Sequence, residues 1–335
     1  MDIVTQGLLG SAMALAGARR KEVKIAALIG FAAGLLADAD ALIRSPGDPL
    51  LTIEFHRHFS HSLLFIPVGA LLATLILWPF LRRRIAPGRL YLYAFLGYAA
   101  SGLLDACTSY GTLLFWPFSD ERIAWNLISI VDPVFSLTLL AAIVYGVRKA
   151  RPQAAWVGLG LAGLYLAVAV VQHQRAEVVA QTLIQQRGHT AVRHVVKPTM
   201  ANLLLWRSIY ESDGRFYVDA VRIGLFSEPR VYRGEQVVKF AAAQHLPQLQ
   251  PGSALAQDIT RFTHFSADFV ALDPTRPGVL IDVRYSMLPT SLSPLWGIEM
   301  TLDNQDRHSL FVNYRDFSPD DRSRFIAMLA GRALP

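Results

Sequence analysis

The sequence has little charge and almost no cysteine. Asp, Glu, Lys and Arg make up 17% of its 335 residues, while 53% are hydrophobic; an average soluble domain carries about 25% charge. Its one cysteine, Cys107, cannot form an intrachain disulfide, so cysteine content does not indicate a redox compartment. The N-terminus lacks the basic residues that open a cleavable signal peptide, so we expect the first apolar stretch to stay in the mature protein. These deficits argue against a wholly soluble protein.

The apolar excess is confined to the first half of the chain. Residues 1–172 contain long apolar runs, whereas 173–335 carry the regular charges, prolines and turn residues of soluble sequence. The length allows about two domains. We therefore predict an all-α polytopic membrane domain of five to six helices over residues 1–172, followed by a small α+β soluble domain over 173–335.

Several apolar runs reach the roughly 20 residues that a membrane-spanning helix needs. They cover residues 25–43, 62–81, 90–110, 124–147 and 154–172. The run at 3–18 is shorter and contains Thr5 and Gln6, so it could span, tilt or form a half-helix. Glycine is frequent in these runs, and small residues let membrane helices approach closely.

Basic residues gather in three of the connecting loops, at 19–24, 82–89 and 148–151. Loops rich in Lys and Arg stay in the cytoplasm, and one topology satisfies all three. It puts 44–61, 111–123 and everything after 173 on the other side. We therefore expect a multi-pass protein of the bacterial inner membrane with a periplasmic C-terminal domain. Because the net charge of +6 follows this topology, we expect no nucleic-acid partner.

Ionisable residues stand out at four places near the predicted outer face: Asp38 with Asp40, the run His56-Arg57-His58-Phe59-Ser60-His61, Asp105, and Asp132. Such residues are costly in a membrane and are functional candidates. Carboxylates and imidazoles together form the ligand set of Zn²⁺, Mn²⁺ or Fe²⁺. Two aspartates two residues apart do not share a helix face, so this pair suits a helix end. The cluster offers enough donors for one ion or two.

Simpler interpretations exist for most of these residues. Asp38 and Asp40 could cap a helix, and His58 could face lipid headgroups. Asp132 directly precedes Pro133, which favours a helix start over a ligand. Asp105 is harder to explain in this way, because a lone carboxylate inside a membrane needs a partner.

Taken in order, the motifs resemble those of the YdjM-like inner-membrane metal-dependent hydrolases. They are Met1-Asp2 with Thr5-Gln6, Ala37-Asp38-Ala39-Asp40, His56-Arg57 with Ser60-His61-Ser62, Leu103-Leu104-Asp105-Ala106-Cys107-Thr108, Phe115-Trp116-Pro117-Phe118, and Asp132-Pro133. The resemblance covers residues 1–150 closely. It implies hydrolase chemistry and a divalent metal ion, Zn²⁺ or Mn²⁺, held at the matching positions Asp38, Asp40, His56, His61 and Asp105.

One position departs from that family pattern. The family usually carries a histidine four residues before the Leu-Leu-Asp aspartate, where this chain has Ser101. A histidine there would share a helix face with Asp105, and serine is a poor ligand for a divalent ion. Either His58 replaces the missing donor, or metal affinity is reduced, or the site is silent.

The soluble half has strand-like runs at 215–223, 262–271, 279–286 and 309–314, and a helix over 319–332 that starts at Ser318-Pro319. Asp213-Gly214 predicts a turn. His264 and His308 fit ordinary core or surface positions better than ligand positions. We expect a small domain that covers the membrane site, selects substrate or binds a partner.

Two functional hypotheses remain open. In the first, the protein is a membrane hydrolase acting near the outer leaflet on a lipid, another amphiphile or a phosphoester. Asp38 would then be the general base or a second-ion ligand, and Arg57 with Arg122 would hold an anionic group. In the second, a non-catalytic membrane protein keeps a structural or degenerate metal site and an interaction domain. A transporter is disfavoured, because the polar residues gather at one face and not along a path through the midplane.

Overall fold

The computed structural model describes residues 1–315 and 317–334. It separates into two compact units, each described here by itself. The helical unit comprises residues 1–43, 55–171 and 200–202. The mixed unit comprises residues 44–54, 172–199 and the chain from Leu203 onward.

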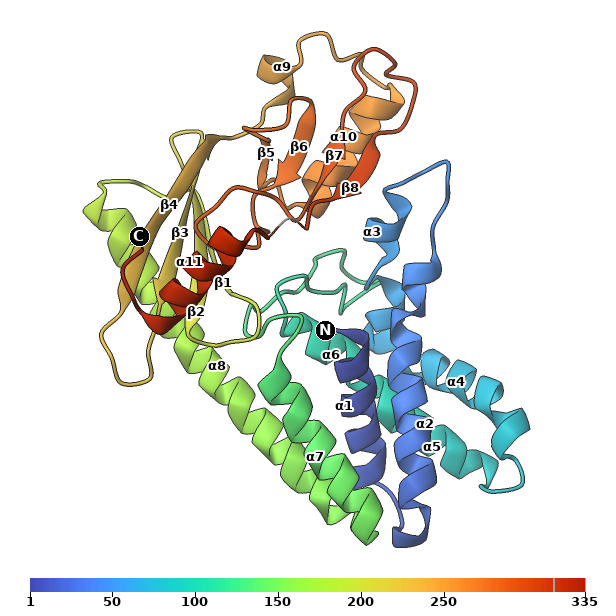
Figure 1. Ribbon diagram of the computed structural model, residues 1–335. Helices are drawn as coiled ribbons and strands as arrows, with labels where there is room; N and C mark the ends of the chain where they lie inside the picture. Colours follow the sequence, from blue (N-terminus) through green and yellow to red (C-terminus); the bar gives the residue numbers. More distant parts are fainter. Residues whose placement is uncertain (316, 335) are drawn as a thin grey trace. The chain divides into compact units, whose positions relative to one another are not determined.

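The helical unit consists of α-helices joined by turns and short 3₁₀ helices (Figure 1). The α-helices are α1 (Ile3–Ala16), α2 (Val23–Leu36), α4 (Ile66–Leu81), α5 (Pro87–Ala99), α6 (Ser101–Ala106), α7 (Pro133–Lys149) and the first part of α8 (Gln153–Gln186). The 3₁₀ helices are Arg20–Glu22, Ala37–Leu42, Phe59–His61 and Leu63–Phe65. The predicted helical N-terminal half is confirmed.

Among the described residues, three helical stretches are long and apolar enough to cross a membrane: Arg20–Leu42, Leu63–Leu81 and Gln153–Gln186. Helix α1 is apolar but shorter. The total of five to six spanning helices stays a prediction.

Two of the predicted apolar helices differ from their expected extents. The run at 90–110 is interrupted at Ala100, which separates α5 from α6. The run at 124–147 becomes helical only at Pro133, because the Asp132 carboxylate accepts a hydrogen bond from the Phe135 backbone and caps α7. Proline fits the first helical position, where its missing N–H costs nothing. The interpretation of Asp132 as a helix start is confirmed.

Glycines bring α1, α2 and α5 into backbone contact. A Cβ on Gly10 would lie 2.4 Å from the carbonyl oxygen of Gly30 and 2.8 Å from that of Gly97. Only residues without a side chain permit this approach, a common means of packing helices in membranes. The close packing expected from the glycine content is therefore present between α1, α2 and α5.

The mixed unit contains two four-stranded antiparallel sheets (Figure 1). The first has the order β1-β2-β3-β4, with β1 (Arg193–Pro198), β2 (Leu205–Ser212), β3 (Arg215–Arg222) and β4 (Arg230–Val238). The second has the order β5-β6-β7-β8, with β5 (Val270–Leu272), β6 (Val279–Asp282), β7 (Trp296–Glu299) and β8 (Leu310–Asn313). The expected turn at Asp213-Gly214 joins β2 to β3, and both residues have positive φ.

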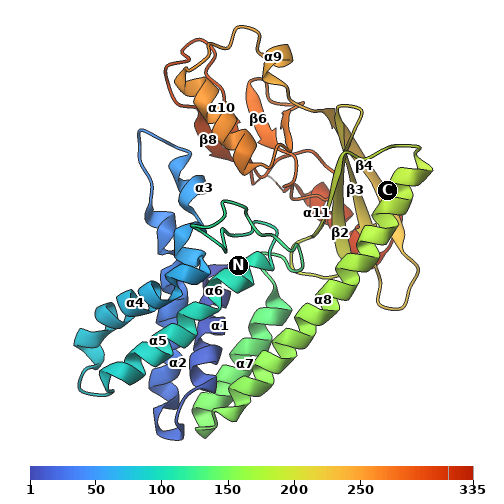
Figure 2. The same ribbon diagram turned by 180° about the vertical axis from the view of Figure 1, so that it is seen from behind.

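Helices cover these sheets. The C-terminal part of α8 lies along the first sheet (Figure 2), where Ala176 and Ala180 pack against Trp206. Helix α10 (Ala254–Phe265) packs on the second sheet, and α11 (Pro319–Ala330) places Met328 against the first. The last helix begins at Ser318 with a capping box, as predicted.

One expected strand was wrong in part. Residues 262–265 end helix α10, and only Val270–Leu272 forms a strand in that region. The helix is favoured because Ser253 caps it and because Leu255, Ile259 and Phe262 recur at helical spacing on its buried face.

Candidate metal centre

Asp38 and Asp40 lie just beyond the end of α2. That helix ends at Leu36, and the chain continues as the 3₁₀ helix Ala37–Leu42. Residues two apart do not face each other on an α-helix, but a 3₁₀ helix turns every three residues and changes their relative direction. The prediction that this pair marks a helix end is confirmed.

Asp40 fastens the segment that carries the histidines. Its Oδ2 accepts hydrogen bonds from the Arg57 backbone N–H at 2.8 Å and from the Ser60 hydroxyl at 2.5 Å. Its Oδ1 lies 3.0 Å from Nδ1 of His56. Arg57 has φ of 59°, a left-handed conformation that is uncommon outside glycine and that concentrates at functional sites. Asp40 therefore holds a strained turn in place.

His61 lies at the centre of the cluster and is 2% exposed. Its Nε2 is 3.0 Å from Oδ2 of Asp105 and 3.4 Å from Oδ1 of Asp38. On the opposite side of the ring, Nδ1 is 3.0 Å from the Ser60 hydroxyl and 3.2 Å from Oδ2 of Asp40. Three carboxylates thus surround one buried imidazole.

Helix α6 brings Asp105 to His61. A Cβ on Gly102 would lie 2.0 Å from the carbonyl oxygen of His61, so any side chain there would push α6 away. The interruption of the helix at Ala100 directs this short segment against the histidine turn. Asp105 is fully buried as a result.

Three buried atoms of the cluster have no hydrogen-bond partner among the described residues: Asp38 Oδ1, His61 Nε2 and Asp105 Oδ2. They face one another, and the ligand atoms of these three residues all lie within 4.8 Å. Unpaired buried polar atoms are costly and rare. A divalent cation would satisfy all three, and one imidazole with two carboxylates suits Zn²⁺ or Mn²⁺. The residues therefore fit a metal ion.

A second group shares Asp38 with the first. Asp38, Asp40 and His56 also offer ligand atoms within 4.8 Å of one another. The two groups together contain all five residues predicted as ligands, and Asp38 lies where they overlap. His56 is only partly buried, with 26% of its side chain exposed. That these residues bind metal stays a prediction.

The charge around His61 is strongly negative. Burial by itself lowers the pKa of His61. The neighbouring carboxylates of Asp105, Asp38 and Asp40 outweigh this effect and raise the pKa to about 10. The imidazole therefore carries a proton at neutral pH unless another cation balances these carboxylates. A metal ion would have to displace that proton.

Arg57 and the N-terminus face the other oxygen of Asp105. The Arg57 guanidinium lies 3.2 Å from Oδ1, and the buried amino group of Met1 also contacts Oδ1. Arg57 further donates to the Met1 carbonyl at 3.0 Å and to the Thr108 hydroxyl at 3.1 Å. Oδ1 thus pairs with cations while Oδ2 faces His61. The Met1 amino group and Thr108 were not among the predicted site residues, although both residues belong to the motifs that carry the family resemblance.

Ser101 lies one helical turn before Asp105, at the position where the family pattern has histidine. Its side chain is buried, and its hydroxyl has no partner among the residues that the structure describes. Nearby, Gln6 donates to the Ser101 carbonyl at 3.3 Å, while Oε1 of Gln6 is likewise buried and unpaired. The position therefore faces a polar environment inside the helical unit.

His58 and Arg122 lie beside the cluster. Nδ1 of His58 accepts a hydrogen bond from the backbone of Phe59 at 2.8 Å, and His58 belongs to neither ligand group. This geometry does not support His58 as the replacement for the missing histidine. The Arg122 guanidinium lies 3.4 Å from the carbonyl oxygens of His56 and Gly111, so it borders the histidine segment.

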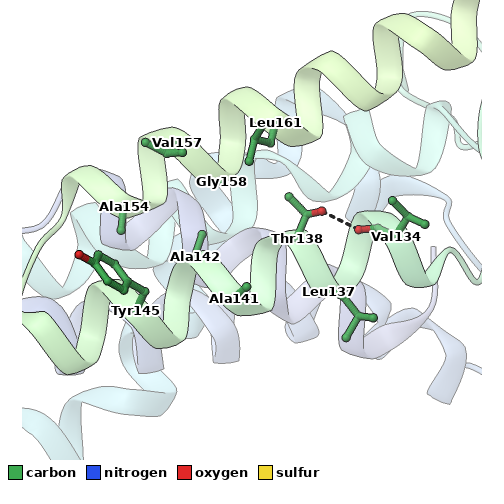
Figure 3. Close-up of a pocket in the computed structure, with 10 residues that line it drawn as sticks. All are labelled: Val134, Leu137, Thr138, Ala141, Ala142, Tyr145, Ala154, Val157, Gly158 and Leu161. Carbon is green, nitrogen blue, oxygen red and sulfur yellow. Dashed lines mark hydrogen bonds between the residues drawn. The ribbon is translucent and has the colours of Figure 1, made fainter.

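An apolar groove of about 720 Å³ runs between α7 and α8 (Figure 3). Gly158 of α8 packs against Ala142 of α7, since a Cβ on the glycine would lie 2.4 Å from the alanine Cβ. The Thr138 hydroxyl donates to the Val134 carbonyl at 2.7 Å, so its hydrogen is already used. Pockets of this volume accommodate small ligands.

Comparisons with known proteins agree with the motif order. A family model described as YdjM inner membrane protein matches residues 1–176. A relative named "Uncharacterized protein YfhP", from Bacillus subtilis (strain 168), is 26% identical over 216 residues. The match covers 63% of this chain and 61% of that relative, less than two thirds of its length. No solved structure matches the chain.

Proposed function

Because the chain belongs to the YdjM family of inner membrane proteins, we propose that it is a membrane-bound, metal-dependent hydrolase. One observation carries this proposal. Asp38 Oδ1, His61 Nε2 and Asp105 Oδ2 are buried and directed toward one another at 3.0–3.4 Å, and none of them makes a hydrogen bond of ordinary geometry among the described residues. A divalent cation that replaces the His61 proton would join all three atoms.

The reaction would occur at the outer face of the membrane. Residues 44–54 belong to the same compact unit as the chain from Leu203 onward, so these two parts lie on one side of the membrane. The positive-inside rule puts the basic loops on the other side. Together these points support a periplasmic C-terminal domain.

Asp38, His61 and Asp105 would hold one ion, and Asp40 and His56 would share Asp38 to hold a second. When bound, such an ion supplies a Lewis acid that polarises the bond to be cleaved. His61 must give up its proton first, and Asp40 and Ser60 keep the ring oriented through Nδ1. Hydrogen bonds of this kind tune a metal ligand.

Asp38 is the best candidate for the general base. It is less buried than Asp105, so in a site that holds only one ion one of its oxygens would be left to accept a proton from an attacking water. The contacts of Arg57 favour a role in positioning Asp105. Its guanidinium pairs with Oδ1 of Asp105 and leaves Oδ2 directed at His61. Contact between Arg57 and an anionic substrate stays a prediction.

The substrate we propose is a membrane lipid or a similar amphiphile with a phosphoester bond. Two features support this class. Asp38 and Asp40 lie at the C-terminal end of an apolar helical stretch, Arg20–Leu42, so a substrate at that depth needs an apolar part. The α7–α8 groove offers an apolar surface in the same unit.

Metal analysis tests the proposal. The full chain, purified in detergent, is analysed for transition metals beside the His56→Ala/His61→Ala double variant. We expect about one or two equivalents in the parent protein and a loss in the variant. Hydrolysis of lipid phosphoesters is then assayed on the loaded protein. If neither sample holds metal after reloading with Zn²⁺ or Mn²⁺, the hydrolase proposal fails.

A non-catalytic role is the second candidate, and Ser101 favours it. With serine where the family pattern has histidine, the cluster holds one donor fewer. In that case the protein would retain a structural or weakened site and use its C-terminal domain for interactions. Metal binding without hydrolysis of any phosphoester tested would favour this candidate.

A further inference from the structure

One short segment of the chain links the two halves of the proposed metal centre. Residues 44–54, which we call the strap, follow directly after Asp38 and Asp40 and precede His56 and His61. The strap nevertheless folds as part of the mixed unit. Its neighbours there lie some two hundred residues later in the chain, as the separation of 207 between Glu54 and Arg261 shows.

Apolar side chains anchor the strap. Leu50 is completely buried and Ile53 nearly so, in one core with Leu255 and Phe262 of α10 and Ile298 of β7. Burying Leu and Ile side chains stabilises a fold by removing apolar surface from water. The strap is therefore an integral part of the domain core.

Arg261 of α10 holds the strap on both sides of these anchors. Its guanidinium donates to both carboxylate oxygens of Asp48, at 3.0 and 2.9 Å, and to both of Glu54, at 2.6 and 2.7 Å. Paired contacts of this geometry are the strongest that an arginine makes with carboxylates. One side chain thus fixes the separation between the two acidic residues.

The same region contains a possible ligand group that is better explained as part of this clamp. Asp48, Asp258 and His308 offer ligand atoms within 4.8 Å of one another. However, Arg261 already lies among them, 3.3 Å from Oδ1 of Asp258. Asp258 also accepts from the Ser309 backbone at 2.7 Å. Asp48 and Asp258 therefore already have a cationic partner in Arg261.

From these contacts we infer that Arg261 is a positioning residue for the proposed metal centre. By holding Glu54, it fixes the chain two residues before His56, a reach of about 7 Å at full extension. By holding Asp48, it fixes the other end of the strap, which follows Asp40. Arg261 thereby restrains, through the chain itself, the segment that leads to His56 and His61. The inference rests on the proposed function, and its effect on the order of residues 56–61 can be measured without metal.

The test compares two arginines of the full chain in detergent. Arg261→Ala removes the clamp. Arg193→Ala is the matched control, because Arg193 also pairs with two acids, Glu211 and Asp268, and is 26% exposed against 24% for Arg261. Arg261→Lys keeps the charge but cannot make the paired contacts. Hydrogen exchange of residues 44–61 and the Kd for Mn²⁺ are measured for each.

We expect faster exchange over residues 44–61 in Arg261→Ala, an intermediate rate in Arg261→Lys and no change in Arg193→Ala. Mn²⁺ affinity should fall about tenfold or more in Arg261→Ala, the usual range for residues that support metal ligands. Glu54→Gln serves if Arg261→Ala fails to fold, since it loosens the clamp without leaving Asp258 unbalanced. Glu54→Gln should also speed exchange over residues 44–61 and weaken Mn²⁺ binding, both by less than Arg261→Ala.

The outcomes separate the two proposals. Unchanged exchange over 56–61 in both Arg261→Ala and Glu54→Gln would overturn the positioning role, whatever the metal result. Equal losses in the Arg193→Ala control would overturn it as well, because the effect would be general destabilisation. A parent protein that binds no Mn²⁺ defeats the proposed function alone, and the exchange data still decide whether Arg261 orders the histidine segment.

Discussion

Among the described residues, each unit contains a cluster of histidine and aspartate, and the two clusters differ in how their acids are hydrogen-bonded. In the mixed unit, Arg261 inserts its guanidinium among the acids and makes a hydrogen-bonded pair with Asp48. In the helical unit, Nε2 of His61 and Oδ2 of Asp105 lie 3.0 Å apart without hydrogen-bond geometry. Ligand atoms at similar spacing can therefore belong either to a hydrogen-bonded arginine–carboxylate network or to a candidate metal site.

This difference shows that proximity of donors does not by itself indicate a metal site. Both clusters bring three ligand atoms within 4.8 Å, but among the described residues only the helical-unit cluster leaves them buried and without hydrogen-bond geometry. Even there, cations are present: Arg57 and the Met1 amino group face Oδ1 of Asp105. They balance one oxygen of the carboxylate, and the second oxygen remains for an ion.

The largest effect is expected from Asp105→Asn. The amide keeps the shape of the side chain but removes the charge opposite Arg57 and the Met1 amino group. Breaking a buried ion pair costs about 3–5 kcal/mol, so thermal unfolding in detergent should occur at clearly lower temperature. Metal content should also fall, because Oδ2 is a ligand in the proposed site.

Asp258→Asn is the control for that variant, since Asp258 is equally buried but belongs to the second cluster. It should lower stability through its lost contact with Arg261 while the parent metal content is largely kept. Were Asp105→Asn to retain its metal, or Asp258→Asn to lose metal to the same extent, the contrast between the clusters would not hold.

A smaller effect of opposite sign is expected from Ser101→His. The new imidazole would stand one turn before Asp105 on the same helix, where the family pattern has histidine. We expect Mn²⁺ affinity to rise about tenfold, equivalent to about 1.4 kcal/mol, as measured by titration calorimetry. A gain in hydrolysis with it would favour a weakened enzyme over a structural site.

Ser101→Ala accompanies this experiment. It removes only the hydroxyl and should leave the metal affinity close to that of the parent protein. If Ser101→His binds no more tightly than Ser101→Ala, the missing histidine does not limit the site.

The candidate ligands could be identified from the sequence because each is an ionisable residue near or inside an apolar run. Asp105 in particular needs a partner, because a lone carboxylate is costly inside an apolar helix. In the structure, His61, Arg57 and the Met1 amino group surround it. The residues that hold these candidate ligands in place were harder to identify from the sequence. Ser60 and Thr108 are ordinary polar residues, and only the folded chain shows that they hold Asp40 and Arg57.

The sequence did not predict that the strap belongs to the mixed unit. Residues 44–54 read as a loop between two apolar helices, and their packing with α10 is a contact over more than two hundred residues. Strand β2 was missed for a related reason. Both of its faces are buried, so the alternation that marks a half-buried strand is absent. Helix α7 and helix α11 could be located because Asp132-Pro133 and Ser318-Pro319 are local start signals.

The smallest effect, and the sharpest check on the second cluster, is expected from His308→Ala. Nδ1 of His308 lies 3.0 Å from Oδ1 of Asp258, but Arg261 and the Ser309 backbone still pair with that carboxylate. We expect a loss of about 1 kcal/mol in unfolding free energy and no change in metal content. His61→Ala, the matched change in the first cluster, should instead abolish metal binding, because no other imidazole reaches Oδ2 of Asp105 among the described residues. Equal metal losses in the two variants would mean that the acids around Arg261 also bind the ion, and the hydrogen bonding of the acids would no longer distinguish the clusters.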